Sequence, residues 1–139
     1  MIAIIDYDAG NLKSVEKALV SLGEEVLVSR DSSEILQADK VILPGVGSFG
    51  DAMNNLDKFG LLDIKPEARL FKGLEGNPYV YFVHSYYLKA ADEGIVAATT
   101  EYTTHIHASV ESGNVFACQF HPEKSSDVGL KILKNFASL

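Results

Sequence analysis

Short apolar runs and segments of helical periodicity alternate along the first half of the chain. Three runs are apolar almost throughout, as is typical of parallel strands buried on both faces: residues 2–5, 26–28 and 40–43. Between the first two, apolar residues recur at helical spacing from Leu12 to Leu22, and Gly23 ends the pattern. A short helix is expected over residues 34–37. Because strand and helix alternate, the sequence predicts right-handed crossovers and an α/β fold with a doubly wound, mostly parallel sheet.

The pattern changes after the third run. Met53, Leu56 and Phe59 would form the apolar face of one more helix, which Gly60 would end. Strand-type runs joined by short turns follow, over residues 79–87, 95–100, 106–110 and 115–120, and a last helix begins near Ser126. Residues 59–66 join the halves without a long linker. We therefore expect one domain over residues 1–139, with an N-terminal half, 1–62, and a C-terminal half, 63–139.

Composition narrows the classes of function. The chain of 139 residues has a formal net charge of −7, which disfavours nucleic acid and anionic membrane surfaces as partners. It has no apolar run of bilayer length, and its N-terminus lacks the features of a signal peptide. Its one cysteine, Cys118, rules out an internal disulfide and fits a reducing cytoplasm. With four scattered histidines it gives no zinc spacing, so we expect a cytoplasmic protein without a metal.

A histidine and a carboxylate lie two residues apart where the last strand ends. In extended backbone, the side chains of His121 and Glu123 would leave on the same face. A carboxylate beside an imidazole fixes its tautomer and stabilises the imidazolium formed during proton transfer. The spacing indicates a general base with its orienting group. A surface histidine beside a surface glutamate is the alternative interpretation.

Glycines are concentrated in residues 45–50, directly after the third strand. They let the backbone approach a ligand and direct its N–H groups at negative charge. The spacing matches the dinucleotide pattern G-x-G-x-x-G, but Pro44 precedes it, and it follows the third strand rather than the first. An oxyanion-binding loop is the functional interpretation, and a tight turn without a ligand is the alternative.

Cys118 invites assignment as a nucleophile because His121 is near it in sequence. Residues three apart on a strand point to opposite faces, so the thiol and the imidazole should not meet. Cys118 lies among apolar neighbours and is predicted to be a small core residue. The nearby aromatic and hydroxyl groups of residues 83–87 would line a polar pocket or belong to an ordinary sheet.

Four segments together resemble one family, the glutaminase subunit of imidazole glycerol phosphate synthase, a triad-type glutamine amidotransferase. The segments are residues 4–12, 43–47, 81–86 and 119–124. The resemblance covers nearly the whole chain in the family's order. It implies that a Cys-His-Glu triad hydrolyses glutamine and that the ammonia passes to a partner, the synthase (cyclase) barrel subunit, which acts on a phosphoribosyl substrate. No cofactor is implied.

The resemblance also assigns roles to residues of this chain. His121 would be the general base and Glu123 its orienting group. The oxyanion loop would be formed by Gly45, Val46 and Gly47. Bound glutamine would contact Ser85 and Tyr86. The face toward the synthase would carry Asn11, Tyr81 and Lys124.

One departure from the family is large. Members carry a segment resembling G-I-C-L-G-x-Q, whose cysteine sits on a strand-to-helix turn, and this chain has no such segment. Against a family domain of about 200 residues, roughly 60 are absent. We expect no nucleophile and no glutaminase activity, because a base without its thiol cannot form the thioester. The sheet would lack a central strand, and would close into a smaller sheet, self-associate through exposed strand edges, or be poorly stable.

Two other functions are compatible with parts of the pattern. A non-catalytic module that binds the synthase barrel would keep the partner-facing residues without the chemistry. A phosphoacceptor receiver domain is suggested by Asp6 and Asp8 after the first strand. The receiver interpretation fails at the third strand, which ends in residues 43–45 rather than in an acceptor aspartate.

Overall fold

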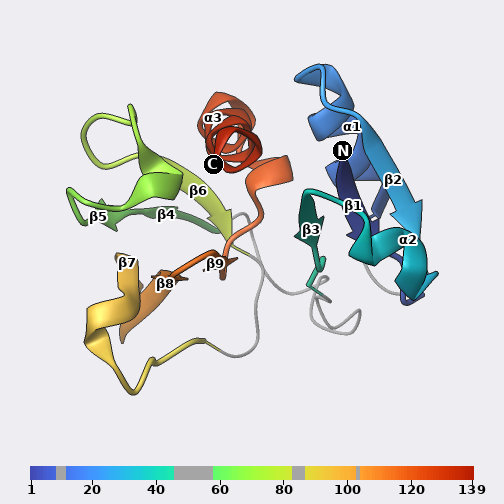
Figure 1. Ribbon diagram of the computed structural model, residues 1–139. Helices are drawn as coiled ribbons and strands as arrows, with labels where there is room; N and C mark the ends of the chain where they lie inside the picture. Colours follow the sequence, from blue (N-terminus) through green and yellow to red (C-terminus); the bar gives the residue numbers. More distant parts are fainter. Residues whose placement is uncertain (9–11, 46–57, 83–86, 103) are drawn as a thin grey trace.

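A computed structural model describes residues 1–8, 12–45, 58–82, 87–102 and 104–139 (Figure 1). The N-terminal part is a parallel three-stranded sheet in the order β2-β1-β3, with Ile2 opposite both Val26 and Lys40. Its strands and the helices that connect them are β1 (Ile2–Ile5), α1 (Leu12–Ser21), β2 (Val26–Ser29), α2 (Ser32–Leu36) and β3 (Lys40–Ile42).

Local sequence explains these elements. The central strand β1 is apolar throughout, and Ile4 is fully buried in it. Val15 and Leu19 are the buried face of α1, and Gly23 follows that helix with φ +84°, a left-handed conformation that favours glycine. Asp31 caps α2 by accepting a hydrogen bond from the backbone N–H of Ser33 at 2.7 Å. The strands and helices predicted for residues 2–43 are confirmed.

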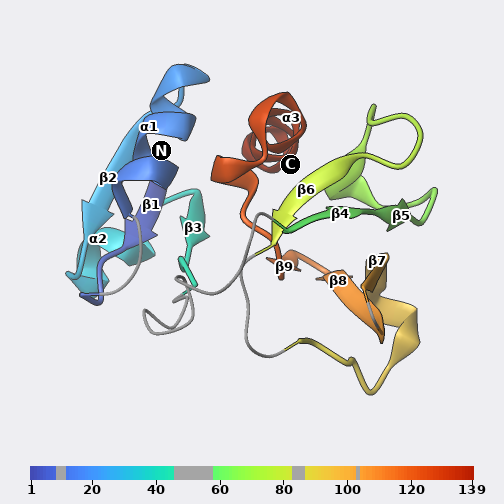
Figure 2. The same ribbon diagram turned by 180° about the vertical axis from the view of Figure 1, so that it is seen from behind.

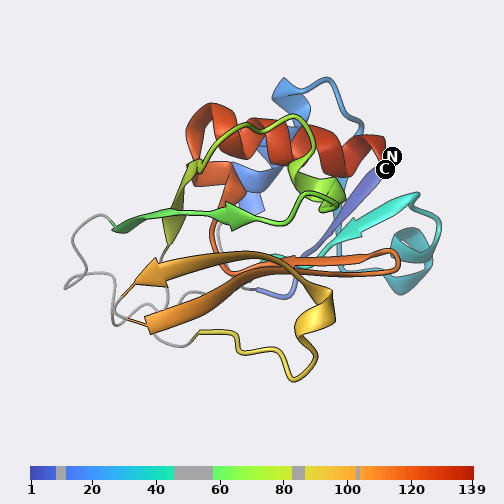
Figure 3. The same ribbon diagram turned by 90° about the vertical axis from the view of Figure 1, so that its left-hand side faces the viewer.

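The C-terminal part is antiparallel. The strands β4 and β6 form one pair, and a second sheet has the order β5-β7-β8-β9. The elements are β4 (Lys58–Leu61), β5 (Asp63–Ile64), η1 (Arg69–Phe71), β6 (Tyr79–Phe82), η2 (Glu93–Ile95), β7 (Val96–Tyr102), β8 (Thr104–Ser112), β9 (Val115–Cys118), η3 (Pro122–Lys124) and α3 (Ser126–Ser138), where η marks a 3-10 helix. Figure 3 shows α3 above the β4–β6 pair, with β7 and β8 below it.

The predicted α/β class with a parallel sheet is confirmed, and the parallel part comprises three of the described strands. One element differs. Phe59 was expected to lie on a helix that Gly60 would end. Both residues belong instead to β4, where Phe59 pairs with Tyr81 of β6. Pairing with a strand distant in sequence outweighs the helical spacing of three apolar residues. The other two residues of that expected helix, Met53 and Leu56, lie outside the described residues.

Two apolar cores meet at α3. The N-terminal core joins β1 to α1 and includes Leu133 of α3. The C-terminal core is formed by residues of η1, β6, β7 and β8, with Leu62 and Phe120, and includes the neighbouring residue Ile132 of α3. Phe136 packs against both cores. Figure 2 shows α3 between the parallel sheet and the antiparallel part, so this helix connects the two cores.

The strand β3 forms one side of the parallel sheet. It pairs with β1, and no other strand of the described residues pairs with it. Val41 is 43% exposed and Leu43, just after the strand, is 67% exposed. Exposed apolar side chains on an edge strand are unusual, because such an edge can pair with another chain.

The described residues also bear on membranes and metals. None of the helices they form is long and apolar enough to cross a membrane. Among the same residues, no group of three or more His, Cys, Asp or Glu side chains is arranged to hold a metal ion.

Candidate active site

His121 lies at a change of backbone conformation. After β9 the buried ring of Phe120 anchors the chain, and His121 is extended, with φ −103° and ψ 97°. Pro122 then begins η3, since its fixed φ suits the first position of a helical turn. The sequence predicted that His121 and Glu123 share a face of extended backbone. They do meet, but Glu123 reaches the imidazole from a 3-10 turn.

The imidazole and the carboxylate are in direct contact. His121 Nδ1 and Glu123 Oε1 are 3.0 Å apart, and the two side chains are 23% and 9% exposed. With Nδ1 donating to the carboxylate, Nε2 is left as the proton acceptor of the neutral ring. This arrangement has the geometry of a general base and its orienting group.

Glu123 is ionised at neutral pH. Burial alone would raise the pKa of its carboxyl group. The hydrogen bond with His121, a hydrogen bond from the backbone, and the charges of His121 and Lys124 outweigh burial, so the pKa of Glu123 is lowered. A carboxylate held in this state can stabilise an imidazolium at His121 when the ring takes up a proton.

Two of the residues expected to face the synthase lie beside the imidazole. Lys124 Nζ is 5.7 Å from the centroid of the Tyr81 ring, a cation–π distance, and the Tyr81 ring is 6.4 Å from the His121 ring. The backbone N–H of His121 donates to the carbonyl oxygen of Tyr81 at 2.9 Å. Tyr81 of β6 therefore contacts both Lys124 and His121.

The glycine loop begins in the described residues with Gly45. A Cβ added at Gly45 would meet no atom of the described residues within 4 Å. The Tyr7 hydroxyl donates to the carbonyl of the preceding residue, Pro44. Arg30 binds the carboxylates on either side of Tyr7, and its hydrogen bond to Asp6 lowers the pKa of that carboxyl group. The remaining predicted residues lie outside the described ones: Asn11, Val46, Gly47, Ser85 and Tyr86.

Cys118 packs against the C-terminal core, and its Sγ lies 3.7 Å from Ser109 Oγ. Burial raises the pKa of the Cys118 thiol to about 12, although the hydrogen bond with Ser109 lowers it in part. Cys118 was expected in the core, and the structure places it half-buried against the edge of that core. A thiol with a raised pKa is a poor nucleophile at neutral pH.

This environment predicts slow alkylation. The raised pKa lowers the thiolate fraction at pH 8, and the greater nucleophilicity of a more basic thiolate offsets only part of this loss, so the folded chain should react with iodoacetamide at least about tenfold more slowly than the unfolded chain. Because Cys118 is the one cysteine, the mass increase on modification reports it directly. The same reaction in guanidinium chloride is the control. Equal rates in the two conditions would contradict the buried position.

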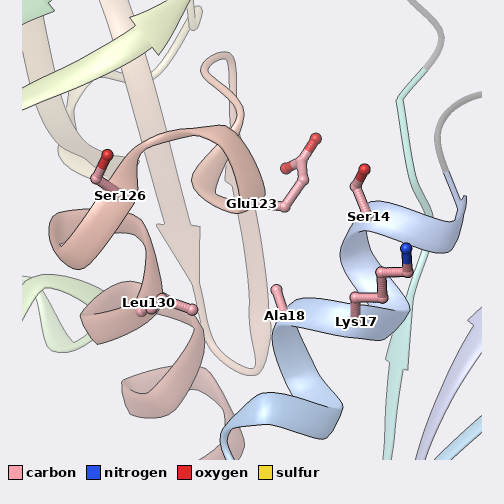
Figure 4. A pocket seen from close by; sticks show the side chains of 6 residues that line it. All are labelled: Ser14, Lys17, Ala18, Glu123, Ser126 and Leu130. Atoms are coloured by element: carbon pink, nitrogen blue, oxygen red, sulfur yellow. The ribbon is translucent and has the colours of Figure 1, made fainter.

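A hollow of about 370 Å³ lies between α1 and the η3–α3 segment, with Glu123 on its wall (Figure 4). Its lining is Ser14, Lys17, Ala18, Glu123, Ser126 and Leu130. Solvent can therefore approach the candidate base pair from the side of α1.

Two residues near the site were not singled out from the sequence. Ser125 is a buried serine whose hydroxyl contacts both His121 and Tyr81, and Gly129 lies on α3 directly against the Pro122 carbonyl. The available signal was weak: Ser125 resembles an ordinary helix-capping serine, and Gly129 an isolated glycine in a helical pattern.

The comparisons with known proteins agree with this geometry. Residues 56–138 match the family model of class-I glutamine amidotransferases. Imidazole glycerol phosphate synthase subunit HisH of Moorella thermoacetica is 38% identical over 198 aligned positions, covering 99% of this chain and 94% of the relative. The HisH subunit of Methanocaldococcus jannaschii is 36% identical over 197 positions, with full coverage of both chains.

Two solved structures share the fold at low identity. A crystal structure of a Thermoplasma acidophilum protein, named as a GMP synthase subunit, has a TM-score of 0.75 at 18% identity, covering 99% of this chain and 92% of that one. PurLQS of Thermotoga maritima has a TM-score of 0.70 at 16% identity, covering 99% and 97%. The fold, the His121–Glu123 pair and the identity to curated relatives lead to one assignment: the chain belongs to the family of HisH subunits of imidazole glycerol phosphate synthase, within the class-I glutamine amidotransferases.

Proposed function

We propose that this chain takes the place of the glutamine-hydrolysing subunit in imidazole glycerol phosphate synthase, but does not hydrolyse glutamine. It binds the synthase (cyclase) barrel subunit in the cytoplasm through the face that carries Asn11, Tyr81 and Lys124. The observation that carries the proposal is an intact His121–Glu123 pair in a chain whose one cysteine, Cys118, packs half-buried against the C-terminal core.

The length of the alignment supports the loss of a nucleophile segment. The alignment with the Moorella relative has 198 positions, which exceeds the 139 residues of this chain by about 60. These roughly 60 extra positions are residues of the relative that have no counterpart in this chain. The sequence lacks the family's cysteine segment. That segment carries the nucleophile, the oxyanion donor that follows it, and a glutamine residue that contacts the substrate.

We infer that the missing segment lies at the join between the two halves, between Leu62 and Asp63. The chain passes there without a linker from the N-terminal half into residues that resemble the C-terminal part of the family domain. The roughly 60 alignment positions without a counterpart in this chain are long enough for such a segment.

Without the thiol, the chemistry stops at the base. Nucleophilic attack on the amide of glutamine needs a thiolate close to the imidazole, and His121 has none to deprotonate. Cys118 does not replace it, because burial keeps its thiol protonated. A binding or regulatory role at the synthase barrel is what remains. The edge of β3 with which no other described strand pairs, next to Val41, would also allow two copies to pair.

The proposal predicts binding without hydrolysis. We expect the purified chain, mixed with the phosphoribosyl ligand and the barrel subunit, to release no more glutamate from glutamine than the His121→Ala variant. It should nevertheless co-elute with the synthase barrel, and Lys124→Glu should weaken that complex. Light scattering on the eluted peak would separate a one-to-one complex from a self-associated form. Glutamate release that depends on His121 would contradict the loss of the nucleophile, and failure to co-elute would contradict the binding role.

A further inference from the structure

One buried hydroxyl joins β6 to the segment that carries the imidazole. The side chain of Ser125 accepts a hydrogen bond from the backbone N–H of Tyr81 at 3.0 Å and donates to the carbonyl of His121 at 2.7 Å. Ser125 is 4% exposed, so both bonds lie away from water. Its own N–H donates to the Pro122 carbonyl, and its carbonyl accepts from Gly129. Each polar group of Ser125 therefore has a partner within the site.

These bonds close a ring around His121. The N–H of His121 donates directly to the Tyr81 carbonyl at 2.9 Å, while its carbonyl is joined to the Tyr81 N–H through the Ser125 hydroxyl. The backbone N–H of Lys124 also donates to the carbonyl of His121, at 3.1 Å. Because both backbone polar groups of His121 are held, the starting point of its side chain is fixed relative to β6.

We propose that Ser125 is a positioning residue: its hydroxyl holds His121 so that Nδ1 meets Glu123 and Nε2 stays free as the proton acceptor. It also connects the imidazole to Tyr81, so a partner that moves Tyr81 changes the orientation of His121. This inference rests on the proposed role of His121 as the base of the site.

The tautomer of His121 is the property that this role controls. With Nδ1 donating to Glu123, the neutral ring carries its proton on Nδ1, whereas a free imidazole in water prefers the proton on Nε2. If Ser125 stops holding the backbone, the 3.0 Å contact between His121 and Glu123 lengthens and the ring relaxes toward the Nε2–H form. A serine that only stabilised the fold would not alter this balance.

Nitrogen NMR of the imidazole in the full chain tests the inference. In the unaltered chain we expect the Nδ1–H tautomer to dominate in the neutral ring of His121. Ser125→Ala should reduce that tautomer by at least half, whereas Ser138→Ala, at an exposed serine at the far end of α3, should leave it unchanged. An unchanged tautomer in a folded Ser125→Ala variant would overturn the proposal.

A second pair of variants removes the effect of side-chain volume. Ser125→Thr keeps the hydroxyl, and Ser125→Val has nearly the same shape without it. We expect the native tautomer with threonine and its loss with valine. The same tautomer in both would overturn the proposal even if the alanine variant failed to fold. The readout needs no glutamate release, so it fails or succeeds independently of the proposed loss of glutaminase activity.

Discussion

Inserting the missing segment of the Moorella thermoacetica relative between Leu62 and Asp63 should raise glutamate release in the presence of the synthase barrel by about 10⁴-fold or more. The physical reason is that the base and its orienting carboxylate are already 3.0 Å apart, and the graft supplies the thiol that they lack. Removing the nucleophile from a triad enzyme costs about this much in rate, so restoring it should return a comparable factor.

The control is the same graft with its cysteine replaced by alanine, which restores the segment and the sheet without the nucleophile. It should stay at the rate of the ungrafted chain. His121→Ala in the active graft should also abolish release. If the alanine graft were as active as the cysteine graft, the increase would come from repair of the fold and not from the triad.

Gly129→Ala should destabilise the protein by about 2–3 kcal/mol, although alanine is the better helix former by about 1 kcal/mol. A Cβ at Gly129 would lie 1.7 Å from the Pro122 carbonyl oxygen and 3.0 Å from Ser125 Cβ. The first of these atoms is backbone, so no side-chain rotation relieves the clash. Either η3 moves away from α3 or the helix shifts, and both changes disturb the segment that holds His121.

Thermal unfolding followed by circular dichroism measures this effect. For a chain of this size we expect the melting temperature to fall by roughly 10 °C. Lys134→Ala, at an exposed position of the same helix, is the matched control and should change stability by less than about 0.5 kcal/mol. A Gly129→Ala variant more stable than the parent would show that helix propensity decides at this position and that the close approach of Pro122 does not.

Much of the N-terminal part could be predicted from local pattern alone. The strand at residues 2–5 is apolar at each position, and the helix after it ends where Gly23 adopts a positive φ, so the pattern and its physical cause coincide. The region around Phe59 could not be predicted in the same way. Spacing fits a helix there, but β4 is set by pairing with β6 about 20 residues later, which local periodicity does not contain.

The candidate site shows the same division. The contact between His121 and Glu123 could be predicted because two residues of spacing keep them close in nearly any local conformation. The bonds of Ser125 could not, because its partner Tyr81 is 44 positions earlier in the chain. The conformation of the turn was also missed, since Pro122 starts a 3-10 helix where extended backbone was expected.

The helix that joins the two cores has a consequence for folding kinetics. Leu133 of α3 packs in the same core as Ile2 and Ile4, from which it is separated by about 130 residues. Contacts of such long sequence separation raise the contact order, and loop-closure entropy opposes them until most of the chain has been ordered. Neither core is complete before α3 docks, so partly folded chains present two apolar surfaces to the solvent. Folding of this protein is therefore slower than its small size suggests, and aggregation competes with it until the last helix is in place.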